Sequence, residues 1–174
     1  MDLVIRPERP ADFPAIRQLL LEAFASTIEP DGVENIRDSW IYLPDLALVA
    51  ELDGHVVGHI MICRCTVTGA AGQRTVAMLT PLAVAPSRQR QGIGAALVRA
   101  ALAGADAAGE PLVVLQGSPA YYGRLGFEDA RKHGIAMDLP DWAPPEAGQV
   151  CLLSSYGADE PGLRGRISYP PVYG

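Results

Sequence analysis

The chain has 174 residues, of which 49% are hydrophobic and 20% are charged, and its formal net charge is −6 at pH 7. This length and composition predict a single folded domain over residues 1–174 with a substantial core. The acidic balance argues against a nucleic-acid-binding protein, and no apolar run approaches the length of a membrane span. The N-terminus lacks the apolar stretch of a signal peptide, so we expect a cytoplasmic protein.

The cysteine and histidine pattern predicts neither a disulfide framework nor a metal site. Cys63 and Cys65 share one face of a predicted strand and cannot easily bridge each other, while Cys151 is distant in sequence. There is no Cys-x-x-Cys pair and the three histidines are scattered.

The N-terminal part predicts a strand followed by two helices. Residues 2–6 alternate as in a strand, and a helix then opens at Pro10–Phe13 with Asp12 as its N-cap. Helical spacing is shown by the apolar residues Ile16, Leu19, Leu20 and Ala23. A second, shorter helix is expected over residues 33–39, after the polar segment 29–32.

Three strands joined by hairpins are expected next. Residues 46–51 are strand-like, and Asp53-Gly54 predicts a tight turn into a partner strand over residues 55–67. The glycine-rich segment 69–72 then turns the chain into a strand over residues 74–85.

Two strand–helix units and an irregular C-terminal third complete the chain. A helix after Gly92 is expected to end near Gly104, and residues 111–117 predict a buried strand. Ser118 can cap a short helix that stops at Gly126. The Pro/Gly-rich remainder predicts edge strands over residues 148–154 and 164–169. This order predicts an α/β (α+β) fold whose mixed sheet has helices on both faces.

The connection from residue 82 to residue 97 is the most informative segment. Pro86 cannot continue a central strand, and Gly92 and Gly94 allow a tight turn that exposes backbone N–H groups. The N-terminus of the following helix carries unpaired donors and a partial positive charge, so this turn predicts a phosphate-binding site.

The surroundings of this turn are free of acidic residues. No carboxylate lies between Asp53 and Asp106, and the arginines of that segment are Arg64, Arg74, Arg88, Arg90 and Arg99. We favour contacts with phosphates for Arg88 and Arg90 because they flank the turn, and a solvated rim is the alternative for both. The arginine content also reflects a chain with a single lysine.

With these elements placed, two motifs resemble the GNAT superfamily of acyl-CoA N-acyltransferases. Residues 89–94, Gln-Arg-Gln-Gly-Ile-Gly, are similar to its Q/R-x-x-G-x-G/A motif. Residues 118–127 are similar to its later motif, in which an aromatic pair precedes Gly-Phe. The resemblance covers nearly the whole chain, is closest to a bacterial subgroup of predicted N-acetyltransferases, and implies a mostly antiparallel sheet of about seven strands.

The resemblance also implies acetyl-CoA as the cosubstrate, without a metal. In such proteins the strand before the turn pairs with pantetheine, which implicates Leu82, Ala83 and Val84. The backbone amide of Leu82 or a neighbour would stabilise the negative charge that develops on the thioester oxygen. The pyrophosphate would be bound by Gln89, Arg90, Gln91, Gly92, Ile93, Gly94 and Ala95.

Tyr122 matches the family's general acid toward the departing thiolate. Reference pKa values of about 10 for tyrosine and 8.5 for a thiol make full proton transfer uphill by about 2 kcal/mol. Tyr122 is therefore expected mainly to donate a hydrogen bond to the thiolate, and a packing role in the core is the alternative. We assign Tyr121 to packing.

The general base is not identified by the sequence. Many relatives carry a glutamate on the strand before the turn, whereas residues 76–80 contain no carboxylate. The candidates are His59, Glu29, Asp31 and Thr80 acting through a water, although a histidine on an apolar strand is usually structural. The missing carboxylate favours an acceptor less basic than a lysine side chain.

These features predict an N-acetyltransferase that acts on a primary amine of a small molecule or peptide. A non-catalytic acyl-CoA-binding module on the same fold is the alternative. A nicotinamide enzyme is disfavoured because Leu97 stands where the third glycine of its motif would be. A covalent cysteine mechanism is also disfavoured, and the expected edge strands allow a homodimer.

Overall fold

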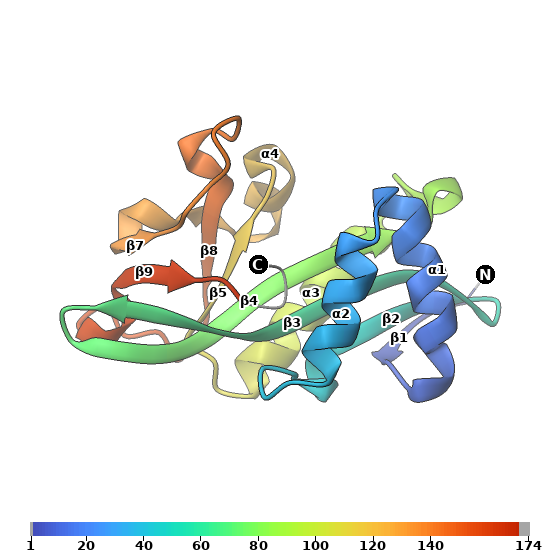
Figure 1. Ribbon diagram of the computed structural model, residues 1–174, viewed down its shortest axis with the longest axis horizontal. Helices are drawn as coiled ribbons and strands as arrows, with labels where there is room; N and C mark the ends of the chain where they lie inside the picture. Colours follow the sequence, from blue (N-terminus) through green and yellow to red (C-terminus); the bar gives the residue numbers. More distant parts are fainter. Residues whose placement is uncertain (1, 171–174) are drawn as a thin grey trace. The chain divides into compact units, whose positions relative to one another are not determined.

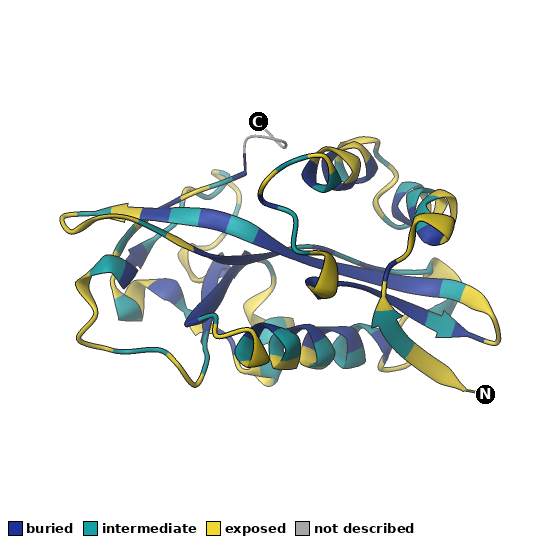
Figure 2. Cartoon of the chain, turned by 90° about the horizontal axis from the view of Figure 1, so that it is seen from below, coloured by how far each residue is buried: buried dark blue, intermediate teal, exposed yellow. Residues whose placement is uncertain are grey.

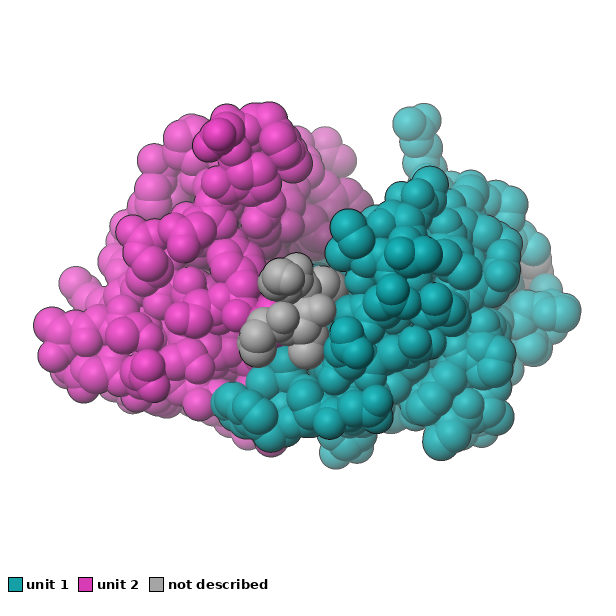
Figure 3. Space-filling view, viewed as in Figure 1, with its two compact units in different colours: residues 1–63, 79–104, 171–174 teal, residues 64–78, 105–170 magenta. Residues whose placement is uncertain are grey.

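The computed structural model describes residues 2–170 (Figure 1). Two compact units are distinguished (Figure 3): the first takes in residues up to 63 and 79–104, and the second residues 64–78 and 105–170. The expectation of one domain over residues 1–174 stays a prediction. No helix within residues 2–170 is both long and apolar enough to cross a membrane.

In the first unit, antiparallel strands form the framework. β1 (Leu3–Pro7) pairs with β2 (Ala47–Leu52), which pairs with the first half of β3 (His55–Gly69). Asp53 and Gly54 join β2 to β3 with φ angles of 51° and 81°. Two left-handed residues are what a two-residue hairpin turn with the right twist requires, so the predicted hairpin is confirmed.

Two helices cover one face of these strands. α1 (Phe13–Phe24) and α2 (Ile28–Arg37) bury Ile16, Leu19, Leu20, Val33 and Ile36 against Val49, Met61 and Cys63. The predicted apolar stripe of α1 is confirmed, with Ala23 packed partly buried at its edge. β4 (Gly72–Val84) contributes Ala83 to the same core.

The opposite face of the first unit is covered by α3 (Ile93–Ala107). A Cβ atom added to Gly58 would lie 2.8 Å from Leu97 Cδ1 and 3.2 Å from Ile93 Cγ2, so the helix packs directly on the backbone of β3. Figure 2 shows α1 and α2 on one side of the strands and α3 on the other. The predicted placement of helices on both faces is therefore confirmed.

The second unit is built around β5 (Leu112–Gln116). It pairs in parallel with β4 at Ala77 and Met78 and antiparallel with β8 (Gly148–Leu152). β8 also pairs with β6 (Glu128–Asp129), while β9 (Gly165–Ser168) pairs with β3 and β7 (Ile135–Ala136). The short helix α4 (Pro119–Tyr122) follows β5.

The sheet connectivity is β1-β2-β3-β4-β5-β8-β6, with β9 and β7 off this path. Only β4–β5 and β7–β9 are parallel among the pairings described for residues 2–170, so the mostly antiparallel sheet is confirmed. The described residues form nine strands where about seven were expected, and two of the nine, β6 and β7, have only two residues each. Single 3-10 turns occupy Pro10–Asp12, Pro44–Leu46, Pro86–Arg88, Gly123–Leu125, Ala130–His133, Pro145–Ala147 and Pro161–Leu163.

Two helix boundaries differ from the prediction. α2 begins at Ile28 rather than at residue 33, because Pro30 falls in the first helical turn, where no intrahelical N–H donor is required. α3 continues past Gly104 to Ala107. A Cβ at Gly104 would lie 2.8 Å from Leu46 Cδ2, so this glycine permits close packing within the helix and does not end it.

Asp12 occupies the N-cap position of α1, as predicted, but its side chain makes no capping hydrogen bond to the helix. Its carboxylate instead accepts hydrogen bonds from the guanidinium of Arg6 at 2.8 and 2.9 Å and from the backbone N–H of Arg9 at 2.8 Å. The contact with Arg6 lowers the pKa of Asp12 from its ordinary value. Through these hydrogen bonds, Asp12 links Arg6 of β1 to the start of α1.

The packing of α3 on β3 leads to a stability prediction. Gly58→Ala should lower the free energy of unfolding by about 1–3 kcal/mol, because the added methyl overpacks the buried contact with Leu97. Gly123→Ala is the matched control, since a Cβ there meets no atom within 4 Å. Urea unfolding of the two variants provides the measurement, and equal stabilities would contradict this packing.

Candidate functional site

The connection between β4 and α3 is tightly folded. β4 ends at Val84, and the N–H of Ala85 donates to the carbonyl of Val57 at 2.8 Å, which ties the end of β4 to β3. The N–H of Arg88 then donates to the carbonyl of Ala85 at 2.8 Å and closes a single 3-10 turn. β4 therefore ends two residues before Pro86, where the sequence predicted the break.

The chain enters α3 through two left-handed residues, Arg90 with a φ of 62° and Gly92 with a φ of 84°. A Cβ at Gly92 would meet no protein atom within 4 Å, so the backbone there is open to a ligand. The N–H of Ala96 makes the first intrahelical bond, to the carbonyl of Gly92 at 3.0 Å. The amides of residues 93–95 precede that bond and are the groups that bind anions at a helix N-terminus.

The side chains around the turn leave positive charge available. Arg90 is exposed and Arg88 is half-buried, and within residues 2–170 neither forms an ion pair. Gln89 donates from Nε2 to the carbonyl of Val84 at 3.2 Å and thereby links the loop to the strand end. An incoming polyanion would meet two uncommitted guanidinium groups and a helix N-terminus.

The last residues of β4 lie beyond its parallel pairing. The ladder with β5 consists of two residue pairs, Ala77 with Val113 and Met78 with Val114. Leu82, Ala83 and Val84 follow this paired part; Ala83 is buried in the core below α1 and α2, whereas its two neighbours are half-buried. All the donor-binding residues predicted from the sequence thus lie in the first unit.

Tyr122 lies in the second unit, at the end of α4. The helix begins as predicted, because the Ser118 hydroxyl accepts the N–H of Tyr121 at 3.3 Å and Pro119 occupies the first turn. The ring of Tyr122 packs edge-on against Tyr121 and Phe127, with centroids at 4.9 and 5.7 Å.

The hydroxyl group of Tyr122 has no hydrogen-bond partner within residues 2–170. Burial raises the pKa of Tyr122 to about 12, so the hydroxyl stays protonated at neutral pH. Full proton transfer to a thiolate would then be uphill by roughly 5 kcal/mol. This side chain is suited to hydrogen-bond donation.

The first unit also holds a buried ionic cluster around Glu8. Both carboxylate oxygens accept from the Arg37 guanidinium, at 2.8 and 2.9 Å, and the side chain of Glu8 has no exposed surface. The Tyr42 hydroxyl donates to the same carboxylate at 2.7 Å, and His59 Nε2 lies 2.9 Å from it. His59, Arg37 and Tyr42 hold the pKa of Glu8 at about 2 against the opposing effect of burial.

His59 is fully buried, and burial lowers its pKa, so the imidazole is neutral. With Nε2 directed at Glu8, its Nδ1 is buried without a hydrogen-bond partner among residues 2–170. A fully buried side chain cannot contact an acceptor amine directly. The structural role that is usual for a histidine on an apolar strand fits this environment.

The other candidate bases occupy different surroundings. Asp31 accepts from Arg17 at 3.0 Å on the surface, and Thr80 is half-buried on β4. Glu29 lies in the first turn of α2, and its Oε2 is buried without a hydrogen-bond partner in the described chain. These three side chains do not form one cluster with His59.

Glu8, Arg37 and Tyr42 were not anticipated from the sequence. Arg37, Tyr42 and His59 lie 29, 34 and 51 positions after Glu8 along the chain, and no local motif connects them to it. The sequence offers two weak signals for this cluster: Glu8 directly follows a strand, and Arg37 ends an amphipathic helix. Such signals are common on solvated surfaces.

Metal and thiol chemistry receive no support from the described residues. The three cysteines are free and buried, and burial raises the pKa of the Cys63 thiol to about 12. Within residues 2–170, no group of three or more His, Cys, Asp or Glu side chains is arranged to hold a metal ion.

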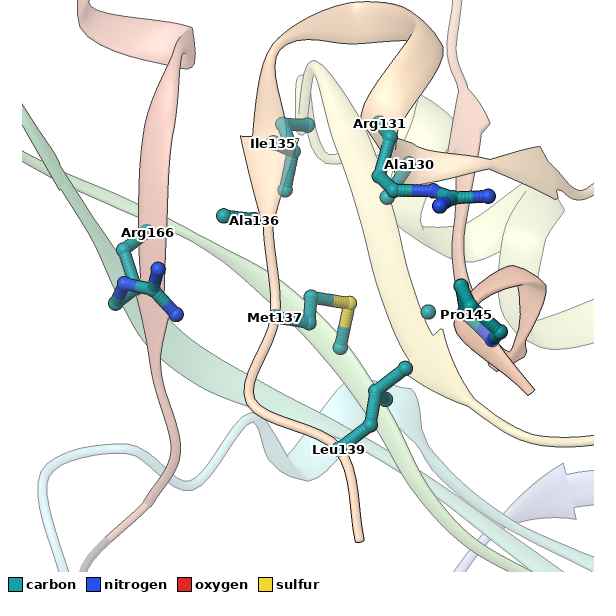
Figure 4. Close-up of a pocket in the computed structure, with 9 residues that line it drawn as sticks. Ala130, Arg131, Ile135, Ala136, Met137, Leu139, Pro145 and Arg166 are labelled. Carbon is teal, nitrogen blue, oxygen red and sulfur yellow. The ribbon is translucent and has the colours of Figure 1, made fainter. Parts of the chain in front are cut away.

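A small pocket of about 180 Å³ lies in the second unit (Figure 4). Arg166 stands on one side and Arg131 on the other, with Met137 and Leu139 between them. Arg131 pairs with Asp129 at 2.7 Å, and Arg166 pairs with Asp138. Both guanidinium groups are therefore engaged, and the volume is below the roughly 300–1,000 Å³ of typical ligand sites.

Comparison with known proteins gives consistent matches. The family model of the acetyltransferase (GNAT) domain matches residues 4–130. The chain is 36% identical over 168 residues to the uncharacterized N-acetyltransferase YhbS of Escherichia coli, covering 96% of both chains. It is 32% identical over 159 residues to the uncharacterized N-acetyltransferase YjhQ of Escherichia coli K12, covering 90% of this chain and 86% of YjhQ.

Two solved structures resemble this chain over almost its full length. The crystal structure of YhbS from Escherichia coli in complex with CoA has a TM-score of 0.86 and 31% identity, covering 98% of this chain and 91% of that one. The structure of a GNAT family acetyltransferase from Brucella melitensis in complex with acetyl-CoA has a TM-score of 0.79 and 30% identity, covering 99% of both chains.

The Glu8 cluster leads to a prediction about stability and pH. Glu8→Gln should lower the free energy of unfolding by about 3–5 kcal/mol at pH 7, because it leaves Arg37 buried without its counter-ion. Glu34→Gln, which removes an exposed contact with Arg17 at 3.1 Å, should change it by no more than about 1 kcal/mol.

The pH dependence has a defined sign. Because folding lowers the pKa of Glu8, its stabilisation is present above the ordinary pKa of 4.5 and is lost as the pH falls toward about 2. Urea unfolding between pH 2 and 7 should therefore show the difference between the native chain and Glu8→Gln shrinking in acid. A difference that is constant over this range would contradict the assignment.

Proposed function

The chain belongs to the GNAT family of N-acetyltransferases, and from this premise we propose that it transfers the acetyl group of acetyl-CoA to a primary amine of a small molecule or peptide by direct attack. The observation that carries the proposal is the open, left-handed turn from β4 into α3, where the amides of residues 93–95 precede the first intrahelical bond and, within residues 2–170, Arg88 and Arg90 form no ion pair. Relatives of the same fold were crystallised with CoA and with acetyl-CoA.

The chain's own residues would hold the donor in two parts. The amides of residues 89–95 would bind the pyrophosphate. Glycine suits position 92 because its φ of 84° is strained for residues with a side chain and because the missing Cβ lets phosphate oxygens approach the backbone. Arg88 and Arg90 would add charge-assisted contacts to phosphate oxygens. Leu82, Ala83 and Val84 would pair through their backbone with pantetheine, as an added strand does.

The chemical step needs a hydrogen-bond donor that stabilises negative charge on the thioester oxygen and a group that assists departure of the thiolate. A backbone amide at Leu82 or a neighbour would donate to the thioester oxygen as negative charge develops on it. The Tyr122 hydroxyl would donate a hydrogen bond to the departing sulfur, and its pKa of about 12 argues for water as the final proton source. Both roles come from the family resemblance, and the protonated hydroxyl of Tyr122 supports the second.

A non-catalytic acyl-CoA-binding module is the second candidate. It is favoured because no general base is evident: His59 is fully buried, and residues 76–80 contain no carboxylate. An acceptor that enters as the neutral amine would remove the need for a general base, so the missing base does not exclude acetyl transfer.

A cytoplasmic location and a homodimer stay predictions.

Binding of the donor is tested by thermal unfolding with acetyl-CoA. At a hundred times the dissociation constant, the ligand should add about 2.7 kcal/mol, which corresponds to a rise in Tm of roughly 5–10 °C for a chain of this size. Arg90→Ala should reduce this rise, whereas Arg99→Ala, which changes an exposed arginine farther along α3, should leave it unchanged. No rise at millimolar acetyl-CoA or longer acyl-CoAs would contradict the proposal.

Catalysis is tested by replacing Tyr122. Tyr122→Phe should lower kcat for thiol release by about 10²- to 10⁴-fold, the usual contribution of a positioned acid. Because the hydroxyl stays protonated below a pKa of about 12, the ratio of native to variant rates should be constant from pH 6 to pH 10. Tyr121→Phe is the control and should keep its rate; an unchanged rate for Tyr122→Phe would remove Tyr122 from the mechanism.

A further inference from the structure

A second pocket in the second unit, with a volume of about 410 Å³, opens where β5 ends and α4 begins. Its walls come from the segment 116–119 on one side and from the loop before β8 on the other. The volume falls within the roughly 300–1,000 Å³ of small-molecule sites. None of the residues that line this pocket belongs to the turn over residues 85–92, which we propose binds the donor.

The pocket adjoins the segment that carries Tyr122. Gly117 lines the pocket, and a Cβ on Gly117 would lie 2.6 Å from Cε2 of Tyr122, so the tyrosine ring lies directly against this glycine. Ser118, which also lines the pocket, caps the helix that ends at Tyr122. A molecule in this pocket would therefore lie beside the side chain assigned to the departing thiolate.

The lining has a distinctive chemistry. None of its side chains is ionisable, and the polar side chains are the amide of Gln116 and the hydroxyl of Ser118. The acidic neighbours in the same loop, Asp141 and Glu146, are not part of the lining. Trp142 lines the pocket with 82% of its surface exposed, which leaves a large flat ring available for stacking.

We propose that this pocket binds the flat, apolar group of the acceptor, so that the substrate is a primary amine with an aromatic or similarly flat body and no second positive charge. The proposal rests on the proposed function and names its substrate class. A polyamine, an aminoglycoside or a basic peptide would bring further ammonium groups, and the lining offers no carboxylate to pair with them.

The transfer balances without another reactant. The amine nitrogen forms a bond to the thioester carbonyl carbon, and the carbon–sulfur bond breaks with its electron pair left on sulfur. The amine loses one proton to water, and the thiolate gains one from water. The pocket contributes binding of the flat body of the amine, which raises the affinity for the acceptor without taking part in the bond changes.

Steady-state thiol release at saturating acetyl-CoA tests the substrate class. 2-Phenylethylamine and tryptamine should give higher kcat/KM values than putrescine and spermidine. Trp142→Ala should raise KM for the aromatic amines roughly tenfold while kcat and the acetyl-CoA-dependent rise in Tm are retained. Trp142→Phe should restore most of the affinity, because it keeps an aromatic face.

Binding can be measured without turnover. The chain has two tryptophans, so Trp40→Phe leaves Trp142 as the only indole. With CoA in place of acetyl-CoA, 2-phenylethylamine should change the emission of this variant saturably, and putrescine should not.

The outcomes separate the two proposals. A preference for polyamines, or an unchanged KM in Trp142→Ala, would overturn the substrate class and leave acetyl transfer intact. A saturable emission change without thiol release from any amine would support the pocket and overturn acetyl transfer. An emission that is unchanged by the aromatic amine would overturn the pocket.

Discussion

Eight residues connect the end of β4 to the start of α3. The proposed acetyl-CoA site depends on the backbone path of this connection. The bond from Ala85 N–H to the Val57 carbonyl fixes where the strand stops. The left-handed residues Arg90 and Gly92 then turn the chain so that the first amides of the helix have no intrahelical acceptor. Close packing of α3 at Gly58 holds that helix end against the strands. The backbone path itself therefore presents the helix N-terminus at which we propose that the pyrophosphate binds.

A buried carboxylate organises the other face of the first unit. Glu8 draws together the end of β1, the last turn of α2 and the middle of β3, and its bonds to Arg37, Tyr42 and His59 satisfy a charge that would otherwise be costly to bury. This arrangement commits His59 to structure and leaves the proposed reaction without an evident base. An amine that enters neutral fits that condition, and the uncharged lining beside Tyr122 fits an acceptor whose body carries no further charge.

Local chemistry made much of the fold predictable. The Asp53-Gly54 turn, the Ser118 cap and the apolar spacing of α1 each depend on residues a few positions apart, and each is confirmed.

The predictions were wrong or missing where the structure depends on contacts between residues far apart in the sequence. The sequence predicts a helix end at Gly104 because the close contact of this glycine with Leu46 is not visible locally, and the Glu8 cluster joins residues up to 51 positions apart. The turn proposed to bind the donor can be located from the sequence because its glycines and arginines are nearly contiguous. The pocket at Trp142 was not, because it combines a strand end with a Pro/Gly-rich loop.

The central claim is that the start of α3 binds the pyrophosphate of acetyl-CoA, and calorimetric titration with two donors tests it most directly. S-acetylpantetheine carries the same thioester and pantetheine but no phosphate. Two or more charge-assisted hydrogen bonds to the pyrophosphate, at roughly 1.5–3 kcal/mol each, should make acetyl-CoA bind at least about 100-fold more tightly. Equal affinities for the two donors would contradict the claim.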